Sequence, residues 1–481
     1  MRVLHVGQGY TPYRHGGLIS YAEDLMEGQA ARGHDVAYFC SGRHYPLLGT
    51  RIKRLRRRGM RIYEVLNSPV VVSQEDRGTR WPEREVSEES IERLFRGVLD
   101  EVRPQLVHFR DMGGLPFSLL DIPHERGLPV IMSLHDYLPL CPTIKLFDLY
   151  GNVCMRTEPA PVCVLCSRDA PHELEGIAHT LGHHRRRVEA RLPVLGRLPG
   201  PRTLARRWRD RRPEADGQGD VEADRVPAFQ RRRDVNVERL SRADRLIAVS
   251  PRVAEIYAAL GVDPSRLLAI PMARTRHESL RPHRIHAVDG PVRFVTLSGC
   301  ASRAKGSGLV ADALDELAAT GFTADDLTLS IAGQVDPYEA ERLTASPFVQ
   351  LLGSYAWAEL DHILEGFHVG IVPSIWEETH GWVGIEYLAK GLPLIGNARG
   401  GIVEYTRDGE TGWLNRESGA SGLAELMAGV VRDPGQVVAL NERIVARRAE
   451  LVKPMATHLD EIEAVYAELI AQSSSTAVSA G

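Results

Sequence analysis

The sequence predicts an α/β protein with two domains, each built on a parallel β-sheet covered by helices. Short β-branched runs alternate with amphipathic stretches along most of the 481 residues, and this alternation is typical of parallel sheets. The pattern fills residues 1–272 and starts again at residue 291, after a polar link that contains Pro and Arg. Because ligands bind at the carboxyl ends of parallel strands, the repeat predicts two Rossmann-like domains that face a central cleft.

Seven strands are expected in the first domain, each at a short apolar run. They cover residues 2–6, 35–39, 70–72, 106–108, 130–134, 245–249 and 267–270. Apolar residues at helical spacing predict helices between them, over residues 19–31, 87–102 and 251–260. Pro104 follows the second helix and Pro251 opens the third, as helix boundaries favour.

The second domain is expected over residues 291–453, with the same alternation. Its strands are predicted at residues 292–297, 327–332, 349–352, 369–372, 394–395 and 413–414. Helices are expected from about residue 306 and over residues 382–390, and a last helix over about 456–471 follows Pro454. We expect residues 473–481 to be a disordered end.

Composition sets broad limits on function. The net charge of −4 says little about partners, and we expect no nucleic-acid partner. No apolar run is long enough to span a bilayer, and the amino terminus has no signal-peptide core. Six cysteines in a chain of this size argue against a disulfide framework. A cytoplasmic protein is therefore expected, with peripheral contact at the inner face of the membrane as a variant of that expectation.

The most specific pattern lies between the strands predicted at residues 369–372 and 394–395. Its loop carries Glu378, and the helix that follows carries Glu386 eight residues later. Free backbone N–H groups at Gly381, Trp382 and Val383 would make the helix start an anion site. Carboxylates on either side of a bound phosphate can hold the hydroxyls of a sugar nucleotide. Two glutamates at this spacing also occur by chance on surface helices, so spacing alone leaves that reading open.

This stretch resembles the E-x7-E signature of family 4 glycosyltransferases, with Glu378 and Glu386 at its two Glu positions. Pro373 and Ser374 end the preceding strand as in the family, and His380 stands where many members have Phe. The resemblance implies the two-domain GT-B fold and a retaining transfer from a UDP- or GDP-linked sugar to an acceptor hydroxyl. In that reading Glu378 holds the donor sugar, Glu386 holds the ribose, and no catalytic metal is needed.

The loop after the first strand of the second domain resembles the family's Gly-Arg…Lys-Gly pattern. Gly299 begins it, and Lys305 and Gly306 match its end. Cys300 occupies the position where Arg is usual, so Arg303 is the candidate to replace that cation. The resemblance implies that Lys305 and Arg303 hold the charge of the departing diphosphate. A solvated loop is the alternative.

Three other loop features resemble parts of the same site. Gly400 and Gly401 match a Gly-Gly loop that cradles phosphate, and Gly16 and Gly17 match a loop of the first domain across the cleft from the donor. His135 follows the strand predicted at residues 130–134 and matches a cleft histidine near the donor sugar. A structural histidine and ordinary tight turns are the alternatives.

Two insertions depart from the alternating pattern. One, at about residues 141–166, carries Cys141, Cys154, Cys163 and Cys166, which predict a structural zinc site. Free thiols are the main alternative, and a disulfide or an iron–sulfur cluster is a further one. The other, at about residues 170–230, is rich in Arg with interleaved apolar residues. It is either a solvated insertion or a contact to an anionic membrane or acceptor.

The resemblance also implies that the tail at residues 454–472 crosses back onto the first domain. The acceptor is open: a lipid-linked molecule, a saccharide and a small molecule all fit. Rival functions are a GT-B epimerase or phosphorylase, and a catalytically silent partner that binds sugar nucleotide. Cys300 stands where Arg is usual, and this missing cation is the feature that favours the silent partner. A phosphorylase would need a lysine that binds pyridoxal, and no pattern in the sequence indicates one.

Overall fold

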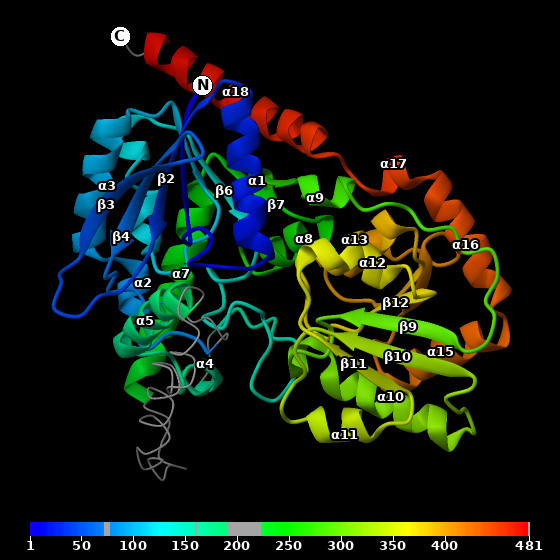
Figure 1. Cartoon of the computed structure of the whole chain (residues 1–481). Helices are drawn as coiled ribbons and strands as arrows, with labels where there is room; N and C mark the ends of the chain where they lie inside the picture. Colours follow the sequence, from blue (N-terminus) through cyan, green and yellow to red (C-terminus); the bar gives the residue numbers. More distant parts are fainter. Residues whose placement is uncertain (72–76, 159–160, 190–222, 480–481) are drawn as a thin grey trace.

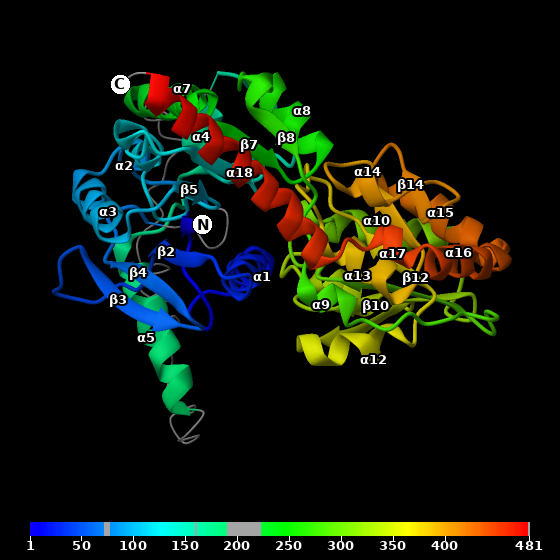
Figure 2. The same ribbon diagram turned by 90° about the horizontal axis from the view of Figure 1, so that it is seen from above.

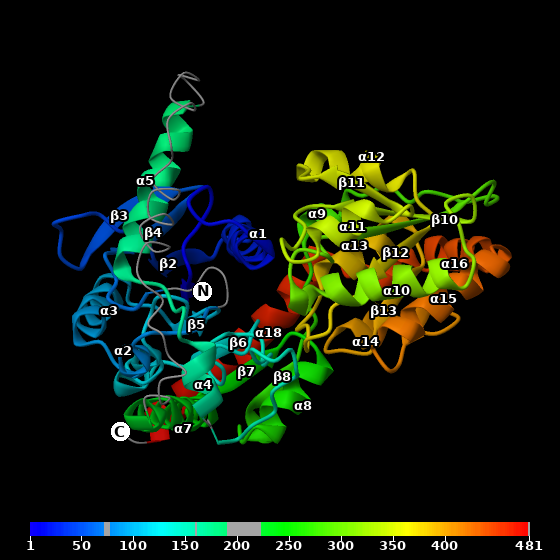
Figure 3. The ribbon, with the colours of Figure 1, turned by 90° about the horizontal axis from the view of Figure 1, so that it is seen from below.

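The computed structural model describes residues 1–71, 77–158, 161–189 and 223–479. Two domains, each with its own sheet and its own apolar core, lie side by side in all three views (Figures 1, 2 and 3). In the sheets every strand pair except one is parallel. The predicted fold class, two parallel-sheet α/β domains, is confirmed.

The N-terminal sheet has eight strands in the order β3-β4-β2-β1-β5-β6-β7-β8. Only the pairing of β3 with β4 is antiparallel in this sheet. The strands are β1 (Arg2–Gly7), β2 (Asp35–Ser41), β3 (Arg51–Arg57), β4 (Met60–Leu66), β5 (Leu106–Phe109), β6 (Val130–Leu134), β7 (Arg245–Ala248) and β8 (Leu267–Ala269).

The edge of this sheet differs from the prediction. The strand expected at residues 70–72 is wrong, because Val70 and Val71 lie outside any strand and residue 72 lies outside the described residues. The hairpin of β3 and β4 takes the edge instead. In β3 the sequence RIKRLRR leaves most side chains at least partly exposed. A charged edge strand discourages pairing with other chains, and it also lacks the apolar run that marks a strand in a sequence.

Helices cover both faces of the N-terminal sheet (Figures 1 and 2). They are α1 (Gly17–Ala31), α2 (Pro82–Val86), α3 (Glu89–Val102), α4 (Pro161–Cys166), α5 (Glu173–Glu189), α7 (Val226–Arg242) and α8 (Pro251–Ala259), with 3-10 turns η1 (Phe117–Leu120), η2 (His124–Arg126), η4 (Ala223–Arg225) and η5 (Pro264–Arg266). The centre of the Arg-rich insertion, residues 190–222, lies outside the described residues, so its predicted roles stay predictions.

The C-terminal sheet is all parallel, in the order β11-β10-β9-β12-β13-β14. Its strands are β9 (Val292–Leu297), β10 (Leu327–Ala332), β11 (Val349–Gly353), β12 (Val369–Val372), β13 (Leu394–Asn397) and β14 (Gly412–Asn415). The first strand, β9, lies between β10 and β12, so the strand order reverses there. In such sheets ligands bind at the carboxyl ends of the strands beside this reversal.

The helices of this domain flank its sheet (Figure 3). They are α10 (Ser307–Ala319), α11 (Ala340–Ala345), α12 (Leu360–Leu364), α13 (Trp382–Lys390), α14 (Ile402–Tyr405), α15 (Ala420–Arg432), α16 (Gly435–Ala446) and α17 (Arg448–Leu451), with η6 (Arg303–Lys305) and η7 (Trp357–Glu359). Gly391 ends α13 in the left-handed conformation, as the Gly-Leu-Pro sequence there suggests.

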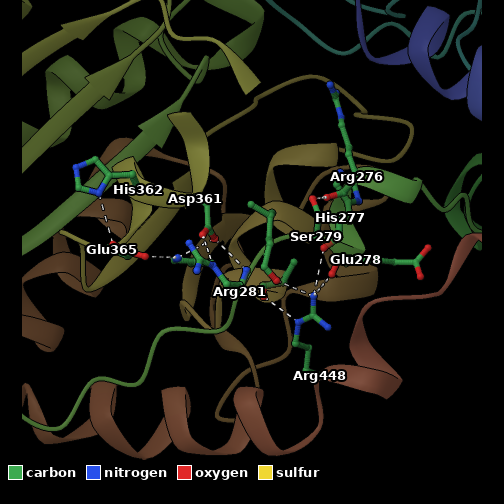
Figure 4. A network of polar contacts seen from close by, with 12 residues as sticks. Arg276, His277, Glu278, Ser279, Arg281, Asp361, His362, Glu365 and Arg448 are labelled. Carbon is green, nitrogen blue, oxygen red and sulfur yellow. Dashed lines mark hydrogen bonds and ion pairs between the residues drawn. The ribbon is translucent and has the colours of Figure 1, made fainter. Parts of the chain in front are cut away.

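The link between the domains is fixed by polar contacts. It contains the one-turn helix α9 (Thr275–Glu278). The guanidinium of Arg448 donates to the carbonyls of His277, Glu278 and Leu280 at 3.3, 3.2 and 2.9 Å (Figure 4). Arg448 of the C-terminal domain therefore binds backbone carbonyls of the link and fixes the position of α9.

The last helix, α18 (Met455–Ser479), runs from the C-terminal domain over the N-terminal one (Figures 1 and 2). It packs against α1, where the Tyr21 hydroxyl lies 2.7 Å from the His458 ring. The disordered end expected from residue 473 is wrong as far as Ser479, since the helix continues that far, and residues 480–481 lie outside the described residues. Within the described ranges, no helix combines the length and apolarity that crossing a bilayer requires.

Candidate functional site

The loop between β12 and α13 sits at the carboxyl edge of the C-terminal sheet and touches the N-terminal domain. The Ser250 hydroxyl, at the start of α8, donates to the Thr379 carbonyl at 3.0 Å. The Thr379 hydroxyl in turn donates to the His135 carbonyl at 2.7 Å. These two bonds join the loop to the ends of β6 and β7 across the domain interface. The loop therefore lies between the domains, where a ligand would contact both.

Lys305 and Glu378 meet on the C-terminal side of this loop. The Lys305 ammonium donates to the Glu378 carboxylate at 2.5 Å, and the Ser374 hydroxyl donates to the same oxygen at 3.1 Å. The ammonium also lies 5.5 Å from the centroid of the Trp376 ring, a cation–π distance. Glu378 is buried, so Lys305 compensates its charge where water screens it poorly. A bound phosphate would have to compete with Glu378 for this ammonium.

The Gly-Gly loop after β13 packs directly against the Glu378 loop. The Gly400 N–H donates to the Glu377 carboxylate at 2.8 Å, and the Gly401 N–H donates to the Glu378 carbonyl at 2.6 Å. A Cβ on Gly400 would clash with the Glu378 carbonyl oxygen. The backbone N–H groups expected to cradle phosphate therefore hold the loop in shape, and Arg252 of the N-terminal domain adds a contact to Glu377 at 3.3 Å.

Glu386 lies within α13 and beside His277 of the link. Its carboxylate is buried and 3.7 Å from His277 Nε2. Burial raises the pKa of Tyr355, and the Glu386 charge adds to that effect. The Glu386 charge acts on the Arg276 guanidinium, which lies 4.1 Å from the Trp357 ring centroid. The Glu386 carboxylate thus lies near two residues of the link, His277 and Arg276.

Trp382, the first residue of α13, packs at the interface of the domains. Its ring lies 4.7 Å from the His380 ring and 5.1 Å from the Arg274 guanidinium. A Cβ on Gly17 would lie 2.6 Å from Trp382 Cδ1, so the first turn of α1 approaches the indole closely only because residue 17 is Gly. Gly17 and Trp382 were each predicted to lie at the site, and the structure brings these two residues of opposite domains into contact.

Three other predicted residues, Gly381, Val383 and Gly16, shape the backbone or the core near this interface. Gly381 takes a positive φ of 73° at the start of α13, and a Cβ there would clash with the Tyr405 hydroxyl. Val383 packs on the C-terminal core. Gly16 begins α1 at φ 135°, with open space around its Cα. Gly381 and Gly16 therefore meet a conformational need at the two helix starts.

His135 ends up buried beside Tyr21, with 5.2 Å between the ring centroids. Burial and the nearby Arg110 charge lower the pKa of His135 well below its usual value, so the ring is neutral at pH 7. Within the described ranges, neither His135 ring nitrogen and none of the three Arg110 guanidinium nitrogens has a hydrogen-bond partner. Buried polar groups without partners are costly, so this pair marks a place where a ligand can supply acceptors.

Arg303 does not join Lys305. Its guanidinium donates to the Tyr150 carbonyl of the cysteine-containing insertion at 2.8 Å. Cys300 is buried in the C-terminal core, and burial raises the pKa of its thiol to about 12. Gly299 lies so close to Thr296 that a Cβ would clash with its hydroxyl. Lys305 is therefore the cation of this loop that faces Glu378.

The structure does not show the predicted zinc site, which stays a prediction. In the described part of the chain, no group of three or more His, Cys, Asp or Glu side chains is arranged to hold a metal ion. Cys141, Cys154, Cys163 and Cys166 are free thiols, and burial raises the pKa of Cys141, and that of Cys166 to about 11. The four cysteines are close in sequence, but closeness in sequence does not determine the direction of their sulfur atoms.

Sequence reasoning missed Arg274, Arg276 and His277. All three lie in the link, which was expected to be a polar hinge, and their pattern has no periodicity that marks a site. Arg274 is almost fully buried and lies 3.9 Å from the Asp24 carboxylate. The only available sign was the density of Arg and His in residues 274–286, which a solvated hinge would share.

Comparisons with known proteins agree with this architecture. Residues 16–159 match the family described as a glycosyl transferase 4-like domain, and residues 291–433 match the family described as glycosyl transferases group 1. Together these matches span more than half of the chain. No curated protein sequence matches it.

Solved structures provide the matching folds. A sucrose-phosphate synthase from Thermosynechococcus elongatus is 16% identical, with a TM-score of 0.60 over 98% of this chain and 100% of that one. HepE from Anabaena, in complex with UDP, is 14% identical, with a TM-score of 0.58 over 97% and 100%. A trehalose-phosphate synthase from Burkholderia xenovorans, in complex with glucose-6-phosphate, is 12% identical, with a TM-score of 0.57 over 96% and 99%. At these identities the likeness concerns the fold alone.

Proposed function

Because the chain belongs to the group 1 glycosyl transferases and has their two-domain GT-B fold, we propose that it moves a sugar from a nucleotide-diphosphate sugar to an acceptor hydroxyl with retention of configuration. The observation that carries this proposal is the start of α13. In the loop before it, Glu378 is bonded to Lys305, and within the helix Glu386 lies beside His277. A donor bound across this helix start would meet a cation, a backbone anion site and two carboxylates in sequence.

The donor's diphosphate belongs at Lys305 in this proposal. A phosphate oxygen replaces the Glu378 carboxylate on the ammonium, and the released carboxylate is then free to accept hydroxyl groups of the transferred sugar. We assign the leaving-group charge to Lys305 and not to Arg303, because the Arg303 guanidinium is bound to the Tyr150 carbonyl. One preorganised donor of this kind is worth about 10²–10³ in turnover.

The ribose belongs at Glu386. A single carboxylate can accept hydrogen bonds from two adjacent hydroxyls, and His277 at 3.7 Å leaves its oxygens available. UDP is the nucleotide to test first, since HepE was solved with it. For the acceptor we propose a saccharide hydroxyl, in line with the glucose-6-phosphate bound to the trehalose-phosphate synthase.

In the transfer step the bond from the acceptor oxygen to C1 of the sugar forms as the bond from C1 to the phosphate oxygen breaks. Both oxygens lie on the same face of the sugar, which retains configuration, and the acceptor proton passes to the departing diphosphate. His135 is neutral at pH 7, so its role is to offer a hydrogen bond in the closed cleft and not to carry charge. Lys305 stabilises the diphosphate as its charge grows.

The test is turnover of UDP- and GDP-linked sugars by the whole chain, with and without saccharide acceptors. We expect release of the nucleoside diphosphate from at least one donor. The anomeric configuration of the product, measured by NMR, should equal that of the donor. An inverted product would contradict retention, and no release from any donor and acceptor pair would contradict the proposed transfer.

A further inference from the structure

A cavity of about 430 Å³ lies between the cysteine-containing insertion and the C-terminal domain. Gly151 and Asn152 line it from the insertion, and Arg303, Arg399 and Ser418 line it from the C-terminal domain. In Figure 1 the teal segment between β6 and α4 extends from the N-terminal domain toward α10, and Gly308 and Leu309 of α10 also line the cavity. Its lining contains none of the residues assigned above to the sugar or the ribose.

The charged side chains that line the cavity are mostly basic, with two arginines and one aspartate. The Arg399 guanidinium has no hydrogen bond or ion pair within the described ranges, and its Nε is buried. Arg303 uses one nitrogen to donate to the Tyr150 carbonyl at 2.8 Å, so its other N–H groups remain for a ligand. The one carboxylate of the lining, Asp312, is paired with Arg342 at 2.6 Å. Arg342 also pairs with Asp315 and Glu339, which lie outside the lining. Among the lining side chains, two guanidinium groups therefore accompany one carboxylate.

Two helices add to this charge. Helices α10 and α15, each of thirteen residues, pack on each other. The second and third residues of α10, Gly308 and Leu309, and the first residue of α15, Ala420, all line the cavity. The amino end of a helix acts as roughly half a positive charge. Two guanidinium groups and two helix starts favour a ligand with two negative charges over a ligand with a single carboxylate. Phosphate is such a ligand, and Arg binds it through paired N–H groups.

We propose that this cavity binds the phosphate group of a phosphorylated small molecule, at a site separate from that of the donor nucleotide. The insertion is part of the site: a Cβ on Gly151 would clash with the Arg303 guanidinium, and residue 151 has a φ of +89° that favours Gly. The short backbone turn at Gly151 thus positions Arg303 at the cavity wall. This inference does not depend on sugar transfer.

The experiment is calorimetry of inorganic phosphate and of glucose-6-phosphate with the whole chain. Arg399→Gln should weaken phosphate binding about ten-fold or more, since it removes a charge-assisted pair of hydrogen bonds. Gly151→Ala should also weaken it, through Arg303. The matched control is Arg416→Gln, which removes an arginine that pairs with Asp408 at the surface and should leave phosphate binding within two-fold.

Lys305→Ala separates this site from the donor's phosphates, and it too should leave phosphate binding within two-fold. Saturating UDP should likewise not displace phosphate. Equal affinities for the two probes identify phosphate itself as the recognised group, and tighter binding of glucose-6-phosphate identifies a sugar phosphate. Thermal melting checks that each variant is folded. The proposal is overturned if the parent binds neither probe, if UDP displaces phosphate, or if binding is lost in Lys305→Ala and kept in Arg399→Gln and Gly151→Ala.

Discussion

Glu378 and Glu386 are two glutamates of one loop-helix segment, and their surroundings differ sharply. Glu378 is bonded to the Lys305 ammonium at 2.5 Å and to the Ser374 hydroxyl at 3.1 Å. Glu386 lies 3.7 Å from His277, whose ring contacts Trp357 and Trp382. A donor bound as proposed must break an ion pair at the first glutamate, whereas at the second it meets a carboxylate that has no cation within hydrogen-bonding distance among the described residues. We therefore expect the two carboxylates to respond differently to each part of the donor.

The largest effect is expected on the Glu378 side. Lys305→Ala removes the cation that stabilises the leaving diphosphate, so turnover should fall by about 10²–10³ at saturating donor. Steady-state release of the nucleoside diphosphate measures this. Lys53→Ala, at an exposed position of β3, is the control and should turn over like the parent. Turnover of Lys305→Ala equal to that of the parent would remove Lys305 from the mechanism.

A second effect concerns His380, which lies in the loop between the two glutamates. Burial, with His277 and His458 nearby, lowers the pKa of His380 to about 3. In the unfolded chain the pKa is about 6.5, so the unfolded state alone takes up a proton as pH falls below that value. Stability from the neutral ring is thus complete above pH 6.5 and is lost as pH falls toward 3.

His380→Phe removes this loss, because Phe does not titrate. Between pH 7.5 and pH 5 the free energy of unfolding of the parent should fall by roughly 2 kcal/mol more than that of the variant. Urea unfolding at the two pH values measures the difference. His362→Asn changes a histidine side chain that is 92% exposed and serves as the control. A parent and variant that lose stability in parallel would show that His380 is accessible to protons in the folded state.

The sequence predicted the strands and the helix that carry this site better than the side-chain contacts within it. The apolar run of β12 and the Gly-Leu-Pro stop after α13 located the helix that carries Glu386. The expected edge of the sheet brought Lys305 and Glu378 to the same loop cluster. Their mutual ion pair was not predicted, because it depends on rotamers and on the Gly400 turn, which alternation of strands and helices does not specify.

Other contacts depend on tertiary packing alone. Arg274 and His277 come to the site because Arg448 binds the carbonyls of the link, an interaction that joins residues about 170 apart in sequence. The four cysteines of the insertion show the converse case. Their spacing predicts a metal site, but a tetrahedral site requires four sulfurs aimed at one point, and no such group is found among the described residues. Spacing along the chain does not specify the direction of the sulfurs.

The smallest expected effect concerns the two glutamates themselves, with Glu386 proposed to hold the ribose and Glu378 the sugar. Calorimetry with UDP, which carries a ribose and no transferred sugar, separates the two roles. Glu386→Gln should weaken UDP binding by about ten-fold or more, because charge-assisted hydrogen bonds to the ribose hydroxyls are lost. Glu378→Gln should bind UDP at least as well as the parent, since it frees Lys305. If both variants bind UDP like the parent, or if only Glu378→Gln loses affinity, the nucleotide does not lie where the account places it.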